Sequence, residues 1–228
     1  MIHFYNVTKA YDNEIKAVSD ITLRIHKGEF VFLVGPSGAG KSTLMKLITR
    51  EELPSRGQLM FNGKNVARMR PREIPHLRRK IGMVFQDFRL LPQKTVAENV
   101  SFALEVTGAS RKYIRKAVPA VLERVGMLDK ANNYPAQISG GEQQRVGIAR
   151  AIINNPMLIL ADEPTGNLDP DTTQGIMNLF NDINRNGTTV IMSTHAWDIV
   201  DSMKRRVVKM TNGKVISDEE SGVYNIAF

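Results

Sequence analysis

The stretch that decides the fold is GPSGAGKS at positions 35–42, which follows the apolar run FVFLV at positions 30–34. A strand, a loop of the form G-x-x-x-x-G-K-[ST] and a helix in this order are typical of a phosphate-binding loop. The glycines let the backbone curl until successive N–H groups point at phosphate oxygens, and the helix adds its positive N-terminal end. Lys41 is expected to reach the β- and γ-phosphates, and Ser42 has a hydroxyl that can ligate Mg²⁺. The stretch therefore predicts a nucleotide-phosphate site.

Three further apolar runs have the near-continuous hydrophobic character of strands that are buried on both faces of a parallel sheet. They cover residues 81–85, 157–161 and 189–192. In an open α/β sheet, ligands bind beyond the carboxyl ends of the strands. The three runs are followed there by Gln86, by the acidic pair Asp162 and Glu163, and by Ser193-Thr194-His195.

The acidic pair suggests catalysis when it is considered beside a phosphate-binding loop. One carboxylate can hold Mg²⁺ through water, and its neighbour can take a proton from an attacking water molecule. The alternative is an acidic turn at the start of a helix. A lone glutamine or histidine at a strand end is more often structural than catalytic, so only the position of Gln86 and His195 supports a role for them.

A smaller antiparallel β layer is predicted near the N-terminus, because Ile21, Leu23 and Ile25 alternate along one strand. Leu59 and Phe61 precede Asn62-Gly63, which is a hairpin turn signal. A second hairpin with a type I′ turn is predicted from residues 206–211, 212–213 and 214–217.

A helical subdomain is predicted to be inserted at about residues 88–155 of an α/β core. Thr95 and Glu98 form a capping box that opens a helix over residues 99–106, and Ser110 can cap a second helix. Pro119 is expected to kink or interrupt that second helix.

Composition excludes several classes of protein. The absence of cysteine removes disulfides, thiolate zinc sites, iron–sulfur clusters and a cysteine nucleophile, and it suits a reducing compartment such as the cytoplasm. No apolar run approaches the roughly 20 residues of a membrane helix, and the N-terminus lacks the features of a secretory signal.

The 31 Lys and Arg against 23 Asp and Glu give a net charge of +8. That charge fits solvated faces, nucleic acid, an anionic membrane surface or phosphate ligands.

Residues Ser139-Gly140-Gly141-Glu142 precede an apolar-periodic stretch and read as a capping box. Two glycines in a first helical turn cost about 1 kcal/mol each relative to alanine. Because glycine has no side chain, they also leave the backbone amides at the helix N-terminus accessible to an anion. The stretch is therefore either an ordinary cap or a second anion site.

In their order and spacing these motifs resemble the ATP-binding subunits of ABC-type systems, over essentially the whole chain. They are the loop at 35–42, Gln86, residues 139–145, Asp162-Glu163, residues 167–169 and His195. The resemblance implies a single domain over residues 1–228: a RecA-like P-loop NTPase core with the β layer at 1–87 and 156–228, and a helical subdomain at 88–155. It also implies ATP as substrate, Mg²⁺, and a head-to-tail homodimer with two composite sites.

The resemblance further implies a role for each site residue. Phosphates and Mg²⁺ are gripped by Gly35, Pro36, Ser37, Gly38, Ala39, Gly40, Lys41, Ser42 and Thr43. Gln86 senses the metal and the γ-phosphate, Asp162 supports Mg²⁺, Glu163 is the general base and His195 contacts the γ-phosphate. Ser139 and Gly141 bind the γ-phosphate from the other subunit, and Asp169 couples the two sites. Tyr11 stacks on adenine; the alternative is an aromatic side chain that packs on the β layer.

Glu142 departs from the glutamine that is common at this point of the family's signature, and it places a negative charge near a phosphate site. This glutamate, together with residues 78–92 and 162–170, is similar to the FtsE subfamily of bacterial cell-division ATP-binding proteins. That similarity implies an integral membrane partner of the FtsX type, control of cell-wall hydrolysis, and a peripheral location at the cytoplasmic face of the plasma membrane. Lipoprotein-releasing and macrolide-exporting ATPases are the alternative, and an ATPase that acts on nucleic acid is disfavoured.

Overall fold

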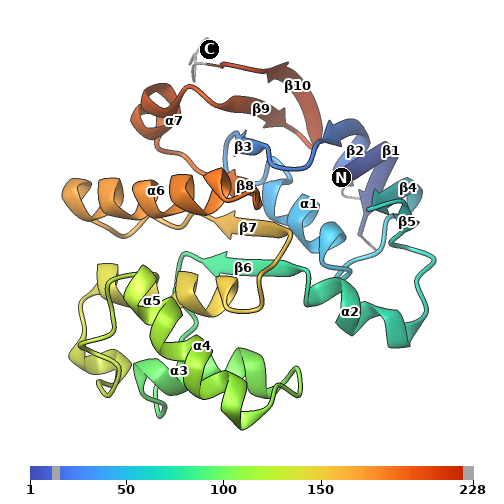
Figure 1. Ribbon diagram of the computed structural model, residues 1–228. Helices are drawn as coiled ribbons and strands as arrows, with labels where there is room; N and C mark the ends of the chain where they lie inside the picture. The colour runs from blue at the N-terminus through green and yellow to red at the C-terminus, as the bar shows by residue number, and fades with distance from the viewer. Residues whose placement is uncertain (12–15, 223–228) are drawn as a thin grey trace. The chain divides into compact units, whose positions relative to one another are not determined.

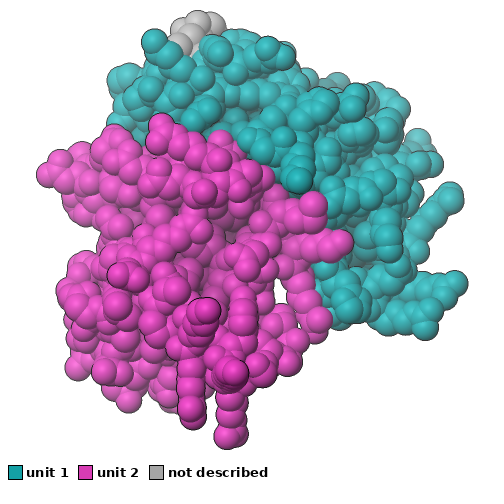
Figure 2. Space-filling view, viewed as in Figure 1, with its two compact units in different colours: residues 1–78, 189–228 teal, residues 79–188 magenta. Residues whose placement is uncertain are grey.

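The computed structural model describes residues 1–11 and 16–222, and its chain divides into two compact units. Unit 1 comprises residues 1–78 and 189–228, and unit 2 comprises residues 79–188. The ribbon in Figure 1 follows the elements along the chain, and Figure 2 colours unit 1 teal and unit 2 magenta.

An antiparallel sheet makes up the N-terminal part of unit 1, with its strands in the order β2-β1-β4-β5 (Figure 1). The strands are β1 (Ile2–Ala10), β2 (Lys16–Ile25), β4 (Arg56–Phe61) and β5 (Lys64–Asn65). Ile21, Leu23 and Ile25 are all buried, as their alternation predicts. Asn62 and Gly63 have φ values of 47° and 77°, the two positive values that a type I′ turn requires. The predicted layer and its hairpin are confirmed.

Unit 1 also contains four strands of a second sheet, three of which are parallel. β3 (Phe30–Val34) lies between β8 (Thr189–Ser193) and β9 (Arg206–Thr211), and β10 (Lys214–Glu219) pairs with β9 in an antiparallel hairpin. Every residue of β3 and β8 is buried, which explains their continuous apolar sequence. The remaining elements are α1 (Lys41–Ile48), η1 (Pro71–Glu73), α2 (Ile74–Arg78) and α7 (Trp197–Met203).

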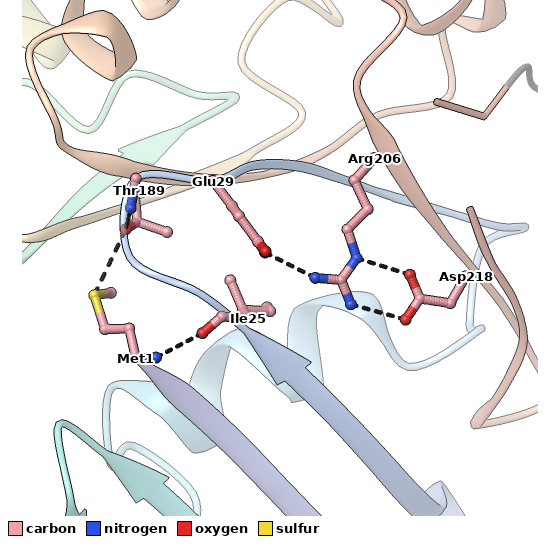
Figure 3. A network of polar contacts seen from close by, with 7 residues as sticks. Met1, Ile25, Glu29, Thr189, Arg206 and Asp218 are labelled. Atoms are coloured by element: carbon pink, nitrogen blue, oxygen red, sulfur yellow. Dashed lines mark hydrogen bonds and ion pairs between the residues drawn. The ribbon is translucent and has the colours of Figure 1, made fainter. Parts of the chain in front are cut away.

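A polar network fastens the C-terminal hairpin to the rest of unit 1 (Figure 3). Nε and Nη2 of Arg206 donate to the two carboxylate oxygens of Asp218, both at 2.8 Å, and Nη1 donates to Glu29 Oε2 at 2.7 Å. These bonds raise the pKa of Arg206, whose side chain is 15% exposed. The forked geometry joins β9 to β10 and to the turn before β3, and it is stronger than a single surface ion pair.

Unit 2 contains a parallel strand pair and four α-helices within residues 79–188. The strands are β6 (Ile81–Phe85) and β7 (Leu158–Asp162). The helices are α3 (Val96–Glu105), α4 (Arg111–Arg124), α5 (Gly140–Ile152) and α6 (Pro170–Arg185), with a short 3₁₀ turn, η2 (Pro135–Gln137). α5 is central, because it contacts β6 and each of the other three helices.

The predicted caps of both helices are confirmed. Pro119 does not interrupt the second helix, and the alternative that it kinks this helix stays a prediction. Thr95 accepts a hydrogen bond from the Glu98 amide and Ser110 accepts one from the Tyr113 amide, so both cap their helices. α4 continues through Pro119 to Arg124. Pro119 is exposed, so water can bond the backbone carbonyl that loses its partner one turn earlier.

The helices α3, α4 and α5 share unit 2 with β6 and β7, and the helical subdomain at residues 88–155 stays a prediction. Over residues 1–11 and 16–222, no helix is long and apolar enough to cross a membrane.

Candidate active site

The loop between β3 and α1 has the backbone shape that a phosphate cradle needs. Gly35 and Gly40 have φ values of 147° and 101°. A Cβ at Gly35 would lie 2.1 Å from the Met210 carbonyl oxygen, and one at Gly40 would lie 2.3 Å from that of Ala17. Both positions therefore require glycine. A Cβ at Gly38 would meet no atom within 4 Å, so the loop is open on that side.

Lys41 begins α1 and folds back over this loop. Its ammonium donates to the carbonyl oxygens of Gly35, at 2.6 Å, and Pro36, at 3.1 Å, and the residue is only 6% exposed. The first turn of α1 has no side-chain cap and no acidic residue. A positive charge and the positive end of a helix therefore lie at the same loop. Ser42 is exposed beside them.

His195 and the loop leave the sheet of unit 1 at the same edge. β3 and β8 are parallel neighbours, with Leu33 opposite Ser193, so the segments that follow both strands emerge together. His195 is exposed there. Tyr11 follows β1 and is 38% exposed, and the Lys9 ammonium lies 4.9 Å from its ring centroid.

Gln86 and Glu163 leave the strand pair of unit 2 at a common edge. Phe85 of β6 lies opposite Asp162, which is the last residue of β7. Gln86 Nε2 donates to Asn167 Oδ1 at 3.4 Å. The structure therefore brings Gln86 to the turn that carries Glu163, and its predicted contact with the metal and the γ-phosphate stays a prediction.

Glu163 has a φ of 50°, in the left-handed region that costs a non-glycine residue about 1–2 kcal/mol. Hydrogen bonds to the carbonyls of residues 163 and 164 help to hold this turn. The Gly166 amide donates to the Glu163 carbonyl at 3.2 Å, and Gln144 Nε2 donates to the Pro164 carbonyl at 2.6 Å. Strained backbone of this kind is often found at active sites. Gln144 is fully buried in α5. It lies within residues 139–145, which carry the family resemblance, but sequence reasoning gave it no role.

α5 also anchors the segment that follows Gln86. Arg150 donates from Nη2 to the Phe88 carbonyl at 2.8 Å and from Nη1 to the Arg89 carbonyl at 2.5 Å. Phe88 and Arg89 have φ values of 59° and 46°. Burial lowers the pKa of Arg150. Through Gln144 and Arg150, one helix fixes both the Glu163 turn and the segment after Gln86.

The start of α5 is the predicted capping box. Ser139 Oγ accepts from the Glu142 amide at 3.3 Å, and Glu142 Oε2 accepts from the Ser139 amide at 2.8 Å. Asp169 is the N-cap of α6 and accepts from the Thr172 amide at 2.9 Å. Hydrogen bonding to the Thr172 side chain, and after it to the Thr172 amide, lowers the pKa of Asp169. A Cβ at Gly141 would lie 2.3 Å from Thr172 Cγ2. Gly141 is therefore needed for the close approach of α5 to α6, whatever it binds.

Gly141→Ala should lower the free energy of unfolding by about 1–3 kcal/mol, because the new methyl group overlaps the Thr172 methyl. The Thr172→Ser change removes that methyl, and the remaining Thr172 atoms lie 3.5 Å from the new Cβ. The double variant should recover most of the loss in urea denaturation followed by circular dichroism. An equally unstable double variant would show that the overlap is not the cause.

The predicted site residues are divided between the two units. Unit 1 holds Tyr11, the loop with Lys41, Ser42 and Thr43, and His195; unit 2 holds Gln86, Ser139, Gly141, Asp162, Glu163 and Asp169. Their assembly into one catalytic site stays a prediction.

Each residue predicted to ligate Mg²⁺ carries an oxygen donor of the kind that this ion prefers. Among residues 1–11 and 16–222, no group of three His, Cys, Asp or Glu side chains could hold a metal by itself. Ser42, Gln86 and Asp162 offer a hydroxyl, an amide oxygen and a carboxylate. Mg²⁺ prefers oxygen ligands and is often held by one or two carboxylates plus substrate phosphates.

Comparison with known proteins identifies the family. The ABC transporter family matches residues 18–166. The cell division ATP-binding protein FtsE of Bacillus subtilis is 54% identical over 98% of each chain, and that of Escherichia coli K12 is 50% identical over 93% of this chain and 96% of its own. A dimeric, post-hydrolysis state of the ATP-binding cassette MJ0796 with ADP and Pi matches with 36% identity and a TM-score of 0.86, over 98% of this chain and all of that one. These similarities confirm the predicted fold class.

Proposed function

Because the chain belongs to the ABC transporter family and is an ATPase of that family, we propose that it is the ATP-hydrolysing subunit of an FtsE–FtsX-type membrane complex. Such a complex would convert ATP-driven dimer closure into control of cell-wall hydrolysis during bacterial cell division. The observation that carries this proposal is the identity of 50–54%, over nearly the full chain, with proteins named cell division ATP-binding protein FtsE. An ATPase subunit of a lipoprotein-releasing or macrolide-type exporter is the alternative that the experiment below can detect.

ATP is proposed to bind with its phosphates on backbone N–H groups of the loop at 35–43, in which Pro36 has none to donate, and on the ammonium of Lys41, and with adenine on Tyr11. Glu163 takes a proton from water as the water oxygen bonds to the γ-phosphorus, and the bond to the bridging oxygen breaks to release ADP and phosphate. Bound Mg²⁺, held through Ser42, Gln86 and Asp162, would neutralise charge on the phosphates. Gln86 and His195 orient the γ-phosphate. The strained, anchored turn at Glu163 supports this assignment.

Two copies are proposed to pack head to tail around two ATP molecules. Ser139 and Gly141 of one subunit bind the γ-phosphate that the other subunit holds, and Asp169 couples the two sites. The similarity to a cassette described as dimeric with ADP and Pi supports this arrangement. The contact of Gly141 with Thr172, whose amide Asp169 binds, gives a physical route for that coupling within one subunit.

The protein is proposed to act at the cytoplasmic face of the plasma membrane as a peripheral subunit, with the helical subdomain at 88–155 toward its partner. Basic side chains near Arg78 and Lys204 are candidates for contact with anionic lipid. Arg78 itself donates to the carbonyl oxygens of Thr49 and Arg50, at 3.1 and 3.3 Å, which gives it a structural task. Exposed Lys204 is the better candidate.

Partner capture tests this proposal. Tagged Glu163→Gln protein would be isolated with ATP from detergent-solubilised native membranes, with the Lys41→Ala form as a control that should not bind ATP. Recovery of an FtsX-like integral membrane protein, dependent on Lys41, is the expected result. An exporter-type permease would make the chain a transport motor instead. Recovery of only soluble or nucleic-acid partners would overturn the membrane assignment.

A further inference from the structure

Glu142 raises a charge problem at the start of α5. A carboxylate in a first helical turn stabilises the helix, but it repels a phosphate that approaches the same turn. In the structure both carboxylate oxygens are engaged. Oε2 accepts the Ser139 amide at 2.8 Å, and Oε1 accepts a hydrogen bond from the Lys130 ammonium. The negative charge of Glu142 is thus matched by one lysine.

The position of Lys130 is built by the turn that carries it. The Lys130 amide donates to the Met127 carbonyl at 3.3 Å, and the Asn133 amide donates to the Lys130 carbonyl at 3.0 Å. Next to it, the Ala97 amide of α3 donates to the Ala131 carbonyl at 2.9 Å. The turn is therefore tied to the start of α3, and its lysine is held where Glu142 can reach it.

The pair is charged and partly shielded from water. The two side chains are 38% and 26% exposed. Hydrogen bonding to Lys130 is the main cause that lowers the pKa of Glu142, and the same bond raises the pKa of Lys130. Both groups therefore keep their charges around neutral pH. Meanwhile the amides of Gly140 and Gly141, the first two of α5, have no partner within the helix, as at any helix start.

We propose that Lys130 is a positioning residue for ATP turnover: it neutralises the charge of Glu142, so that the Ser139–Gly141 end of α5 can accept the γ-phosphate of ATP from the partner subunit. This inference rests on the head-to-tail dimer of the proposed function. Without Lys130, the carboxylate keeps its cap but presents an uncompensated charge to the phosphate. The affinity between closed subunits then falls, while the chemistry at Glu163 is unchanged.

A series of variants that remove or keep each charge tests the pair. Lys130→Met removes the charge and keeps most of the stem, and it should raise the KM for ATP, and the concentration at which Glu163→Gln protein dimerises with ATP, by about 3- to 10-fold. Glu142→Gln added to Lys130→Met should restore both values to within about twofold of the parent. Lys130→Arg keeps the charge and should behave like the parent. Lys112→Met, at an exposed lysine of α4, is the matched control and should change nothing.

The outcomes separate this inference from the function on which it rests. Lys130→Met with unchanged KM and dimerisation would overturn the inference alone, and so would a double variant as impaired as Lys130→Met, because the lysine would then serve the fold rather than the charge. A parent protein that hydrolyses ATP but never dimerises with it would overturn the proposed dimer and this inference together. Thermal unfolding of each variant shows that the comparison is made between folded proteins.

Discussion

Glu163→Gln should lower kcat for ATP hydrolysis about 100- to 10,000-fold, which is the usual contribution of a positioned general base. Glutamine keeps the size and the hydrogen-bonding oxygen of glutamate, but it cannot take a proton from water. The affinity for ATP should stay within about threefold, because the proposed role begins only when the water attacks. Phosphate release under steady-state conditions measures kcat, and a fluorescent ATP analogue measures the affinity.

The backbone at Glu163 makes this variant a clean test. Its φ of 50° and the bonds from the Gly166 amide and Gln144 involve main-chain atoms of residues 163 and 164, so the side-chain change leaves these features intact. Asp171→Asn, at an exposed acid in the first turn of α6, removes the same charge from unit 2 and should hydrolyse ATP at close to the parent rate. If Glu163→Gln hydrolyses ATP as fast as its parent, the base is another group.

The parts of the fold that sequence predicted are those with local physical causes. Asn62-Gly63 and Asn212-Gly213 adopt the positive φ values that few other dipeptides tolerate, so both hairpins could be located in advance. The caps at Thr95 and Ser139 are equally local. Pro119 shows the limit, because its effect depends on whether water reaches the backbone beside it, and that is decided by how α4 packs.

The site residues also divide into those that the sequence predicts and those that become apparent only in the fold. The phosphate loop and the Asp162-Glu163 pair were visible because their chemistry is carried by neighbouring residues. The supports were not visible: Gln144 reaches Pro164 across 20 positions, and Lys130 reaches Glu142 across 12. Such contacts exist only after α5 has packed against the elements around it. The reacting groups can therefore be predicted from one sequence more easily than the residues that hold them in place.

Lys41→Ala should weaken ATP binding about 30- to 1,000-fold, or about 2–4 kcal/mol, because a poorly exposed charge that faces phosphate contributes far more than a surface ion pair. Lys41 is 6% exposed, and its ammonium is already held at the loop by the Gly35 and Pro36 carbonyls. Little entropy is then lost when it meets the phosphates. Titration with fluorescent ATP and ADP analogues measures the effect. ATP should lose more affinity than ADP, since only ATP has the γ-phosphate.

Lys46→Ala is the matched control, because it removes the same charge from the exposed face of the same helix. It should bind ATP within about twofold of the parent, since an exposed charge is screened by water and salt. Lys41→Arg separates charge from geometry. Arginine restores the charge but carries it on a broad, planar group in place of a compact ammonium, so it should recover only part of the affinity. Equal losses at Lys41 and Lys46 would mean that overall charge, and not the built loop, holds the nucleotide.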